Sequence, residues 1–278
     1  MKKISRRSFL AAAGLSVAAL ALTACGGSAS SVASSVASSA SSAAASTSAA
    51  AGELTTVEAG KLTMATNAAF PPYEMTTDAG EFEGIDIETA QAIADKLGLE
   101  LQIDDMDFDA ALLSVQQGKA DIVMAGVTVT DERKAVMDFS DSYATGIQSI
   151  IVPEGSDIAS PDDLAGKMIG TQRGTTGYIY CSDDFGDESV VAYDDGLTAV
   201  QALNNGQVDA VVIDNAPAQE FVAANPGLKI LDTSYAEEDY AIGMAKNSPL
   251  EDAINSTLEE LKADGTLQSI VDKYITAE

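Results

Sequence analysis

The sequence predicts an α/β fold made of two lobes, each with its own mainly parallel sheet. Strand-like and helix-like segments alternate along residues 54–278, and several strands are short and wholly apolar, as at 122–125 and 210–213. Such strands are typical of sheets covered by helices on both faces. A Gly-x-x-Asp frame followed by an apolar strand occurs at Gly118 and again at Gly206, an offset of 206 − 118 = 88 residues. Two similar lobes would give this repeat, and so would a common helix-to-strand turn used twice.

The individual elements follow from hydrophobic periodicity and from glycines that end helices. Residues 88–97 place apolar side chains at Ala90, Ile93, Ala94 and Leu97, the spacing of one helical face, and Gly98 follows. Residues 109–117 form a similar segment that stops at Gly118. The remaining predicted helices begin at 175 or cover 197–204, 249–263 and 267–274, and the predicted strands cover 62–66, 122–125, 167–171 and 210–213.

Composition excludes several classes of function. The 278 residues are 46% hydrophobic, which is enough for a substantial core in one large domain or two ordinary ones. The chain has no His, so it lacks the commonest general base and the commonest zinc ligand, and its two Cys cannot form a four-thiolate site. We therefore expect no metal and no cofactor. The formal net charge of -28 repels phosphate backbones, which argues against nucleic-acid binding.

The N-terminus has the three parts of an export signal, predicted to end at residue 24. Basic residues at 2–7 precede an apolar run at 9–22 that is short for a transmembrane helix, and small residues follow. The pair Arg6-Arg7 is compatible with twin-arginine export and with the general secretory route. Leu22-Thr23-Ala24-Cys25 resembles the bacterial lipoprotein box, which implies a lipid on Cys25; an ordinary cleavage site that includes Cys25 is the alternative.

Residues 25–53 are nearly all Ser and Ala, and they carry no charge before Glu53. This composition buries too little to offset the entropy of ordering, so we predict a disordered tether. A lipid followed by a tether would hold the globular part near the outer face of the cytoplasmic membrane, or on the periplasmic side in a cell with an outer membrane. Cys181 has no partner for a disulfide in this arrangement, and we expect it to act as a small buried hydrophobe.

The candidate binding residues follow the predicted strands, because parallel sheets bind ligands beyond the carboxyl ends of their strands. These positions combine aromatic rings, hydroxyls, one arginine and one aspartate. A guanidinium can hold a carboxylate in two parallel hydrogen bonds, and an aspartate can accept from an ammonium group. The set suits a small zwitterion. It comprises Asn67, Phe70, Phe108, Ala125, Gly126, Thr128, Arg133, Gln172, Thr175, Thr176 and Asp214.

Several motifs together resemble the family 3 extracellular solute-binding proteins, the binding components of polar amino-acid ABC transporters. The resemblance covers about residues 62–274. It rests on the runs Ala65-Thr66-Asn67-Ala68-Ala69-Phe70-Pro71-Pro72-Tyr73-Glu74, Gly84-Ile85-Asp86-Ile87, Met106-Asp107-Phe108, Ala125-Gly126-Val127-Thr128-Val129-Thr130-Asp131-Glu132-Arg133, Asp138-Phe139-Ser140, Gly174-Thr175-Thr176-Gly177 and Asp209-Ala210-Val211-Val212-Ile213-Asp214.

The resemblance implies a role for most candidate residues. Arg133 would pair with the ligand α-carboxylate, helped by Thr128 and the backbone at Gly126, and Thr175 and Thr176 would reach it from the other lobe. Asp214 would hold the α-ammonium group. Phe70 and Phe108 would wall the side-chain pocket. Asn67 stands where many members carry an acid that contacts the ligand side chain. This departure argues against a cationic ligand and favours a polar or neutral side chain, such as an amide.

The predicted architecture is therefore a type II periplasmic-binding-protein-like fold. Residues 54–148 with 245–278 form one lobe, residues 149–244 form the other, and two hinge crossovers lie near 149–152 and 240–245. The predicted protein is a monomer, not an enzyme, that closes on a free amino acid and delivers it to an ABC permease with its ATPase. A membrane-tethered amino-acid sensor and an enzyme of the same fold, such as a dehydratase, are the alternatives.

Overall fold

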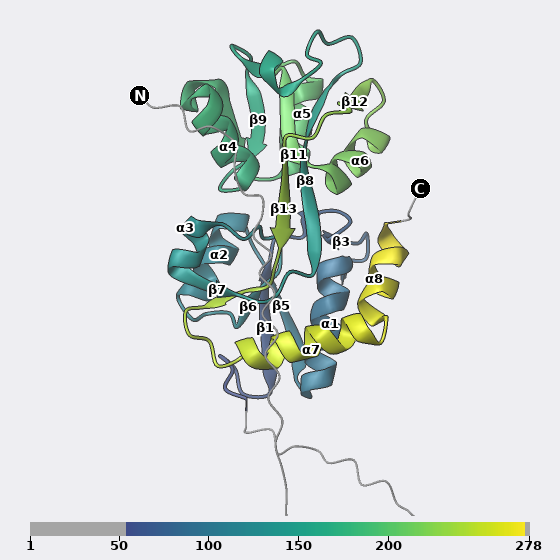
Figure 1. The fold of residues 1–278 in the computed structure, drawn as a ribbon. Coiled ribbons are helices and arrows are strands. Elements are labelled where there is room, and N and C mark those ends of the chain that lie inside the picture. Colours follow the sequence, from purple (N-terminus) through teal and green to yellow (C-terminus); the bar gives the residue numbers. More distant parts are fainter. Residues whose placement is uncertain (1–53, 276–278) are drawn as a thin grey trace, which may run out of the picture. The chain divides into compact units, whose positions relative to one another are not determined.

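The computed structural model describes residues 54–275 (Figure 1). The predicted signal peptide at 1–24, the predicted tether at 25–53 and Cys25 lie outside the described residues. Within residues 54–275, every helix is too short or too polar to cross a membrane.

The first lobe is organised around the sheet β5-β1-β6-β14-β7. Strand β1 (Lys61–Thr66) runs parallel to β5 (Glu100–Asp105) and to β6 (Ile122–Val123). Strand β14 (Gly243–Ala245) is antiparallel to β6, and β7 (Met137–Phe139) is antiparallel to β14. All of β1 beyond its first residue is buried, as expected for a central strand covered on both faces.

Helices from both ends of the described chain cover this sheet. They are α1 (Ile85–Leu97), α2 (Phe108–Gln116), α7 (Glu251–Ala263) and α8 (Thr266–Tyr274). Helix α1 ends at Gly98, whose φ of 71° is the left-handed conformation that glycine adopts without strain. The C-terminal helices α7 and α8 pack against α1 (Figure 1), so the end of the chain returns to the first lobe.

The second lobe is organised around the sheet β10-β9-β11-β8-β12. Its parallel strands are β9 (Ile169–Gln172), β10 (Val190–Tyr193) and β11 (Ala210–Asp214), and β8 (Ala144–Pro153) and β12 (Leu228–Ile230) complete it in antiparallel pairings. Helices α4 (Thr176–Phe185), α5 (Gly196–Asn204) and α6 (Asn215–Ala224) and the 3-10 helices η1 (Pro161–Leu164) and η2 (Asp187–Ser189) belong to the same lobe.

The Gly-x-x-Asp frame makes the same contact in both lobes. In the first lobe, the Thr63 N–H donates to Asp121 Oδ2 at 2.8 Å and the Asp121 N–H donates to the Thr63 carbonyl at 2.9 Å. In the second, the Met168 N–H donates to Asp209 Oδ2 at 2.8 Å and the Asp209 N–H donates to the Met168 carbonyl at 2.8 Å. Each aspartate thus fixes a helix-to-strand turn against the neighbouring strand, which is the structural role that the spacing indicates.

Two strands, β8 and β13, pass between the lobes. Strand β13 (Ala236–Tyr240) pairs antiparallel with residues 144–148 of β8, and Figure 1 shows the two strands running side by side between the two sheets. The division into 54–148 with 245–278 and 149–244 remains a proposal. The second crossover was predicted near residues 240–245. Because β14 is hydrogen-bonded to β6 of the first lobe, we place this crossover a few residues earlier, in β13.

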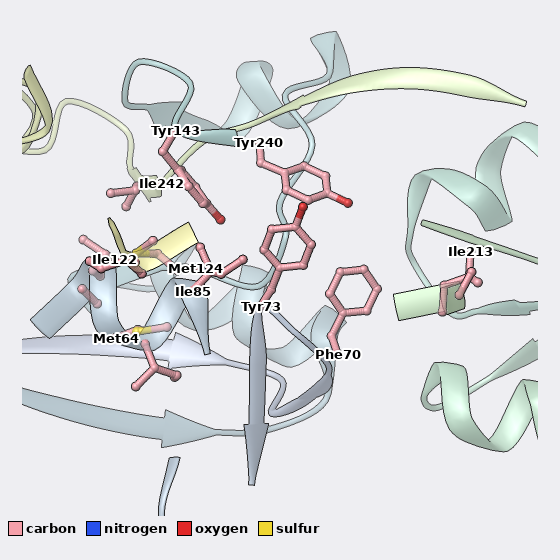
Figure 2. Close-up of a cluster of buried hydrophobic side chains, with 14 of the residues drawn as sticks. Met64, Phe70, Tyr73, Ile85, Ile122, Met124, Tyr143, Ile213, Tyr240 and Ile242 are labelled. Atoms are coloured by element: carbon pink, nitrogen blue, oxygen red, sulfur yellow. The ribbon is translucent and has the colours of Figure 1, made fainter. Parts of the chain in front are cut away.

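Aromatic rings end the core of the first lobe on the side that faces the second. Figure 2 shows Phe70, Tyr73 and Tyr240 next to one another, beyond the aliphatic side chains of the first sheet. The Phe70 and Tyr73 rings stack with centroids 5.8 Å apart, and Tyr73 meets Tyr240 edge-on at 5.3 Å. Phe70 belongs to a small sheet of β2 (Ala69–Phe70), β3 (Glu74–Thr76) and β4 (Phe82–Glu83). In the second lobe Cys181 is buried in the core, as predicted.

Candidate functional site

Arg133 is fixed by both lobes. It lies in α3 (Asp131–Val136), a short helix whose N-cap Thr130 accepts the Arg133 N–H at 3.2 Å. The guanidinium donates from Nη1 to the Thr128 carbonyl at 2.8 Å and from Nη2 to the Gly174 carbonyl of the second lobe at 3.1 Å. Its carbon lies 5.3 Å from the centroid of the Phe108 ring. Burial lowers the pKa of Arg133, but a guanidinium stays charged. Of its about five N–H donors, two bind these carbonyls, so about three remain for a ligand.

A carboxylate on β13 connects the two lobes behind the cavity. Glu238 is buried, and its Oε2 accepts from the Thr128 hydroxyl of the first lobe and from the Thr176 hydroxyl of the second, both at 3.0 Å. The same oxygen accepts from Gln148 Nε2 on β8 at 3.1 Å. The charge of Glu238 also favours the charged form of Arg133. One carboxylate therefore contacts both lobes and both crossing strands.

Asp214 ends β11 and faces the cavity from the second lobe. Its Oδ2 accepts from Gln148 Nε2 at 2.8 Å, and its Oδ1 accepts a short hydrogen bond from the Tyr240 hydroxyl. Burial raises the pKa of Asp214 to about 7, although the Tyr240 hydrogen bond opposes this. A carboxylate has about four lone-pair sites, so Asp214 can still accept from an added donor.

Glycine is required where the first-lobe loop passes the aromatic rings. Gly126 has a φ of +54°, and a Cβ atom there would lie 2.8 Å from the Phe70 ring. Its N–H donates to Asp86 Oδ2 at 3.0 Å. In this conformation the Gly126 N–H is therefore not free to donate to a ligand carboxylate, as the resemblance implied. The role of Gly126 is instead to let the loop pass close to the Phe70 ring.

Two amides meet across the cavity. Gln172 Nε2 of the second lobe donates to Asn67 Oδ1 of the first lobe at 2.8 Å, and Asn67 Nδ2 donates to the Met106 carbonyl at 3.0 Å. Thr175 caps α4, with its hydroxyl accepting the Tyr178 N–H at 3.3 Å and donating to the Gln172 carbonyl at 2.8 Å. Together with the Arg133–Gly174 bond, the amide pair shows that the lobes touch across the site.

The structure brings all the sequence-predicted binding residues to the wall of one cavity of about 430 Å³. This volume includes space that is open to solvent. Arg173, which directly precedes Gly174, is exposed and pairs with Asp194 at 3.6 Å. Four residues of the wall were not predicted from the sequence: Glu74, Gln148, Val212 and Ile213.

The missed polar residues carried a weak signal in the sequence. Gln148 is a single polar amide in the mostly apolar run of β8, and such an amide needs a buried partner. Glu74 directly follows the Phe-Pro-Pro-Tyr run, and it is fully buried on a strand of only three residues. Glu238 is one of three consecutive acids on β13, and the sequence does not show which of them faces inward.

The fold and the site define a two-lobed binding protein for a small solute with charges of both signs. Comparison with known proteins gives the family. The profile of the bacterial extracellular solute-binding proteins, family 3, matches residues 62–277, and this chain belongs to that family. The predicted family and the two-lobed α/β fold are thereby confirmed.

Similar proteins include both sequences and solved structures. The chain is 32% identical to the L-cystine-binding protein TcyJ of Escherichia coli (strain K12), over 80% of this chain and 85% of TcyJ. It is 32% identical to the arginine-binding extracellular protein ArtP of Bacillus subtilis (strain 168), over 78% of this chain and 87% of ArtP. A solved structure of an ancestral arginine-binding protein bound to glutamine is 42% identical, with a TM-score of 0.75, over 78% of this chain and 99% of that one.

Proposed function

We propose that this protein captures a free amino acid with a polar side chain between its two lobes and delivers it to an ABC importer. The observation that carries the proposal is that Arg133 of the first lobe and Asp214 of the second line the same cavity. Arg133 would take the α-carboxylate with the hydroxyls of Thr128, Thr175 and Thr176, and Asp214 would take the α-ammonium group. The similar proteins named above bind cystine, arginine or glutamine, which supports an amino acid as the ligand.

The aromatic walls suit the apolar part of such a ligand. Phe70 and Phe108 line the cavity, and Ala125 and Gly126 leave room beside them. The lobes would open to admit the ligand and close when it touches both, because closure is favoured by contacts that exist only in the closed state. We propose that the permease, with its ATPase, recognises this closed form.

Isothermal titration against the common amino acids tests the binding proposal. At least one is expected to bind with a 1:1 stoichiometry, and small-angle scattering should show compaction when it binds. A folded protein that binds none of them would contradict the proposal. The enzyme alternative predicts that the tight-binding ligand is recovered chemically altered after incubation; we expect it unchanged.

The delivery step also includes the N-terminal segment. Supported by Leu22-Thr23-Ala24-Cys25, we propose that Cys25 carries a lipid, that residues 25–53 act as a tether, and that the monomer works on the outer side of the cytoplasmic membrane. Metabolic labelling with a tagged fatty acid checks this: the wild type should incorporate the label, and Cys25→Ser should not. Import of the bound amino acid should be lost in a strain that lacks a permease encoded beside this protein. Unchanged import in that strain would favour the sensor alternative.

A further inference from the structure

Glu74 is a buried acid at the cavity wall with no ordinary hydrogen-bond partner. The side chain lines the cavity and has no exposed surface. Within residues 54–275, no N–H or hydroxyl group donates to either of its carboxyl oxygens. Its neighbour is the carboxyl group of Asp86, and two carboxyls can share a hydrogen bond only while one of them keeps a proton. A buried carboxyl group without a paired donor costs folding free energy, and a ligand that supplies the donor would offset that cost.

The backbone fixes the two acids beside each other. The Ile85 N–H donates to the Pro72 carbonyl at 3.1 Å, and the Asp86 N–H donates to the Tyr73 carbonyl at 2.8 Å. Gly84 lets the start of α1 approach this closely, because a Cβ atom there would lie 2.2 Å from the Tyr73 carbonyl oxygen. The Asp86 carboxyl also accepts from Gly126 in the binding loop. The pair is therefore a rigid part of the site and not a mobile surface cluster.

The surroundings of the pair are negative. The charges that act most strongly on Glu74 are those of Asp86, Asp214 and Asp105, and the hydroxyl groups of Tyr73 and Tyr143 lie around the pair. Burial raises the pKa of Glu74 well above its usual value and that of Asp86 to about 6. Burial and the mutual repulsion of two negative charges therefore favour a protonated form of the pair when no ligand is bound. A cationic group with several N–H donors would satisfy both oxygens and replace that proton.

We propose that Glu74, positioned by Asp86, is the residue that recognises the end of the ligand side chain, and that this end is cationic, a guanidinium or an ammonium group. The inference rests on the proposed function, since the α-carboxylate and α-ammonium are held by Arg133 and Asp214. Charge and protons balance: the proton shared by Glu74 and Asp86 leaves to solvent as the cation arrives, so one positive charge replaces another. Asn67 by itself favours a ligand with a neutral side chain, because many members of the family carry an acid at that position. In this proposal Glu74, which lines the same cavity, provides the negative charge that Asn67 lacks.

Isothermal titration with L-arginine, L-lysine and the uncharged arginine isostere L-citrulline tests the proposal. Wild type is expected to bind arginine or lysine roughly 30-fold or more tighter than citrulline, the low end of the effect of one buried charge partner. Repeating the titration in buffers of different ionisation enthalpy should show release of about one proton for the cation and none for citrulline.

Glu74→Gln keeps the shape of the side chain and removes its charge. The variant should lose the preference for the cation and the proton release, while its affinity for citrulline stays close to that of wild type. Asp86→Asn should abolish proton release as well, and it serves if the first variant fails to fold. Glu81→Gln, the same change at an exposed site in the adjoining turn, is the matched control and should behave as wild type.

The outcomes separate the two proposals. If Glu74→Gln weakens every amino acid equally, Glu74 contacts the α-ammonium group, and the side-chain assignment is wrong. If wild type binds a neutral amino acid but neither arginine nor lysine, the cationic ligand is wrong and the proposed function stands. If no amino acid binds to folded wild type, the proposed function itself fails.

Discussion

In the first lobe Asp121 accepts the N–H of Thr63, and in the second lobe Asp209 accepts the N–H of Met168 at the same point of the Gly-x-x-Asp frame. The loops beyond the opposite ends of the strands show no such correspondence. The first lobe supplies a buried cation, Arg133, and the second supplies a buried anion, Asp214. Because the cation and the anion come from different lobes, we expect a ligand with two opposite charges to be bound fully only when it touches both lobes.

Removing the charge from the second lobe is expected to have the largest effect on binding. Asp214→Asn keeps an acceptor oxygen but leaves the ligand ammonium unpaired, which should weaken binding by about 2–5 kcal/mol. The closed fraction at saturating ligand should fall too, because the ligand then distinguishes less between open and closed states. Titration calorimetry and small-angle scattering measure the two effects. Wild-type affinity and full compaction would show that Asp214 is structural.

Changing the geometry in the first lobe is expected to have a smaller effect. Arg133→Lys keeps the charge but loses the bidentate fork and the bonds to the Thr128 and Gly174 carbonyls. Affinity should fall by about ten- to a hundredfold, corresponding to about 1.5–3 kcal/mol, while the melting temperature of the ligand-free protein changes little. An unchanged dissociation constant would remove Arg133 from the ligand contacts.

The ligand-free protein should lose stability as the pH rises from 5 to 8. The buried acids Asp86 and Asp214 have pKa values raised to about 6 and about 7, and the pKa of Glu74 is also raised well above its usual value. A group whose pKa is higher in the folded state stabilises that state at low pH, and this contribution is lost as the pH rises through the folded-state value. From Asp86 and Asp214 alone we expect a decrease in unfolding free energy on the order of 4 kcal/mol.

Chemical denaturation across this pH range measures the effect. Because the chain has no His, few other side chains titrate in the window. Asp214→Asn should flatten the part of the curve near pH 7. A stability that is constant or that increases with pH would show that these acids are ionised without strain in the folded protein.

The repeated frame gives a test within the comparison itself. Asp121 is buried and accepts from both Thr63 and Val57, whereas Asp209 is exposed and accepts from Met168. Asp121→Ala should reduce the free energy of unfolding by about 1.5 kcal/mol, the low end for hydrogen bonds to a charged group, and Asp209→Ala by less. Urea denaturation checks the order. The reverse order would mean that the two turns are not equivalent.

Sequence patterns predicted the parts of this molecule whose signal is local. Helix α1 carries its apolar spacing and its terminal Gly98, and β6 and β11 are short apolar runs, so each was predicted to within three residues. Helix α3 escaped prediction because its six residues, four of them charged, have no apolar period. Strand β13 is rich in acids and becomes a strand because it pairs with β8, a contact distant in sequence.

The same distinction applies to the candidate site. Arg133 and Asp214 follow recognisable strands or motifs, and the fold brings them to the same cavity. Glu74 and Glu238 were missed because an acid that will be buried looks like any other acid in a chain with 43 Asp and Glu. Their positions depend on the close approach of α1 to the chain before β3 and on the pairing of the crossing strands.

The single oxygen of Glu238 that accepts from Thr128, Thr176 and Gln148 has a consequence for release of the ligand. An incoming carboxylate that takes a hydrogen bond from either hydroxyl competes with an acceptor already in place, so only the difference between the two acceptors adds to affinity. The same oxygen takes back the hydroxyls when the ligand leaves, and no buried donor is stranded. A binding protein that must release its ligand to a transporter benefits from this exchange. The affinity stays moderate, and the hydroxyl groups keep an acceptor after the ligand has dissociated.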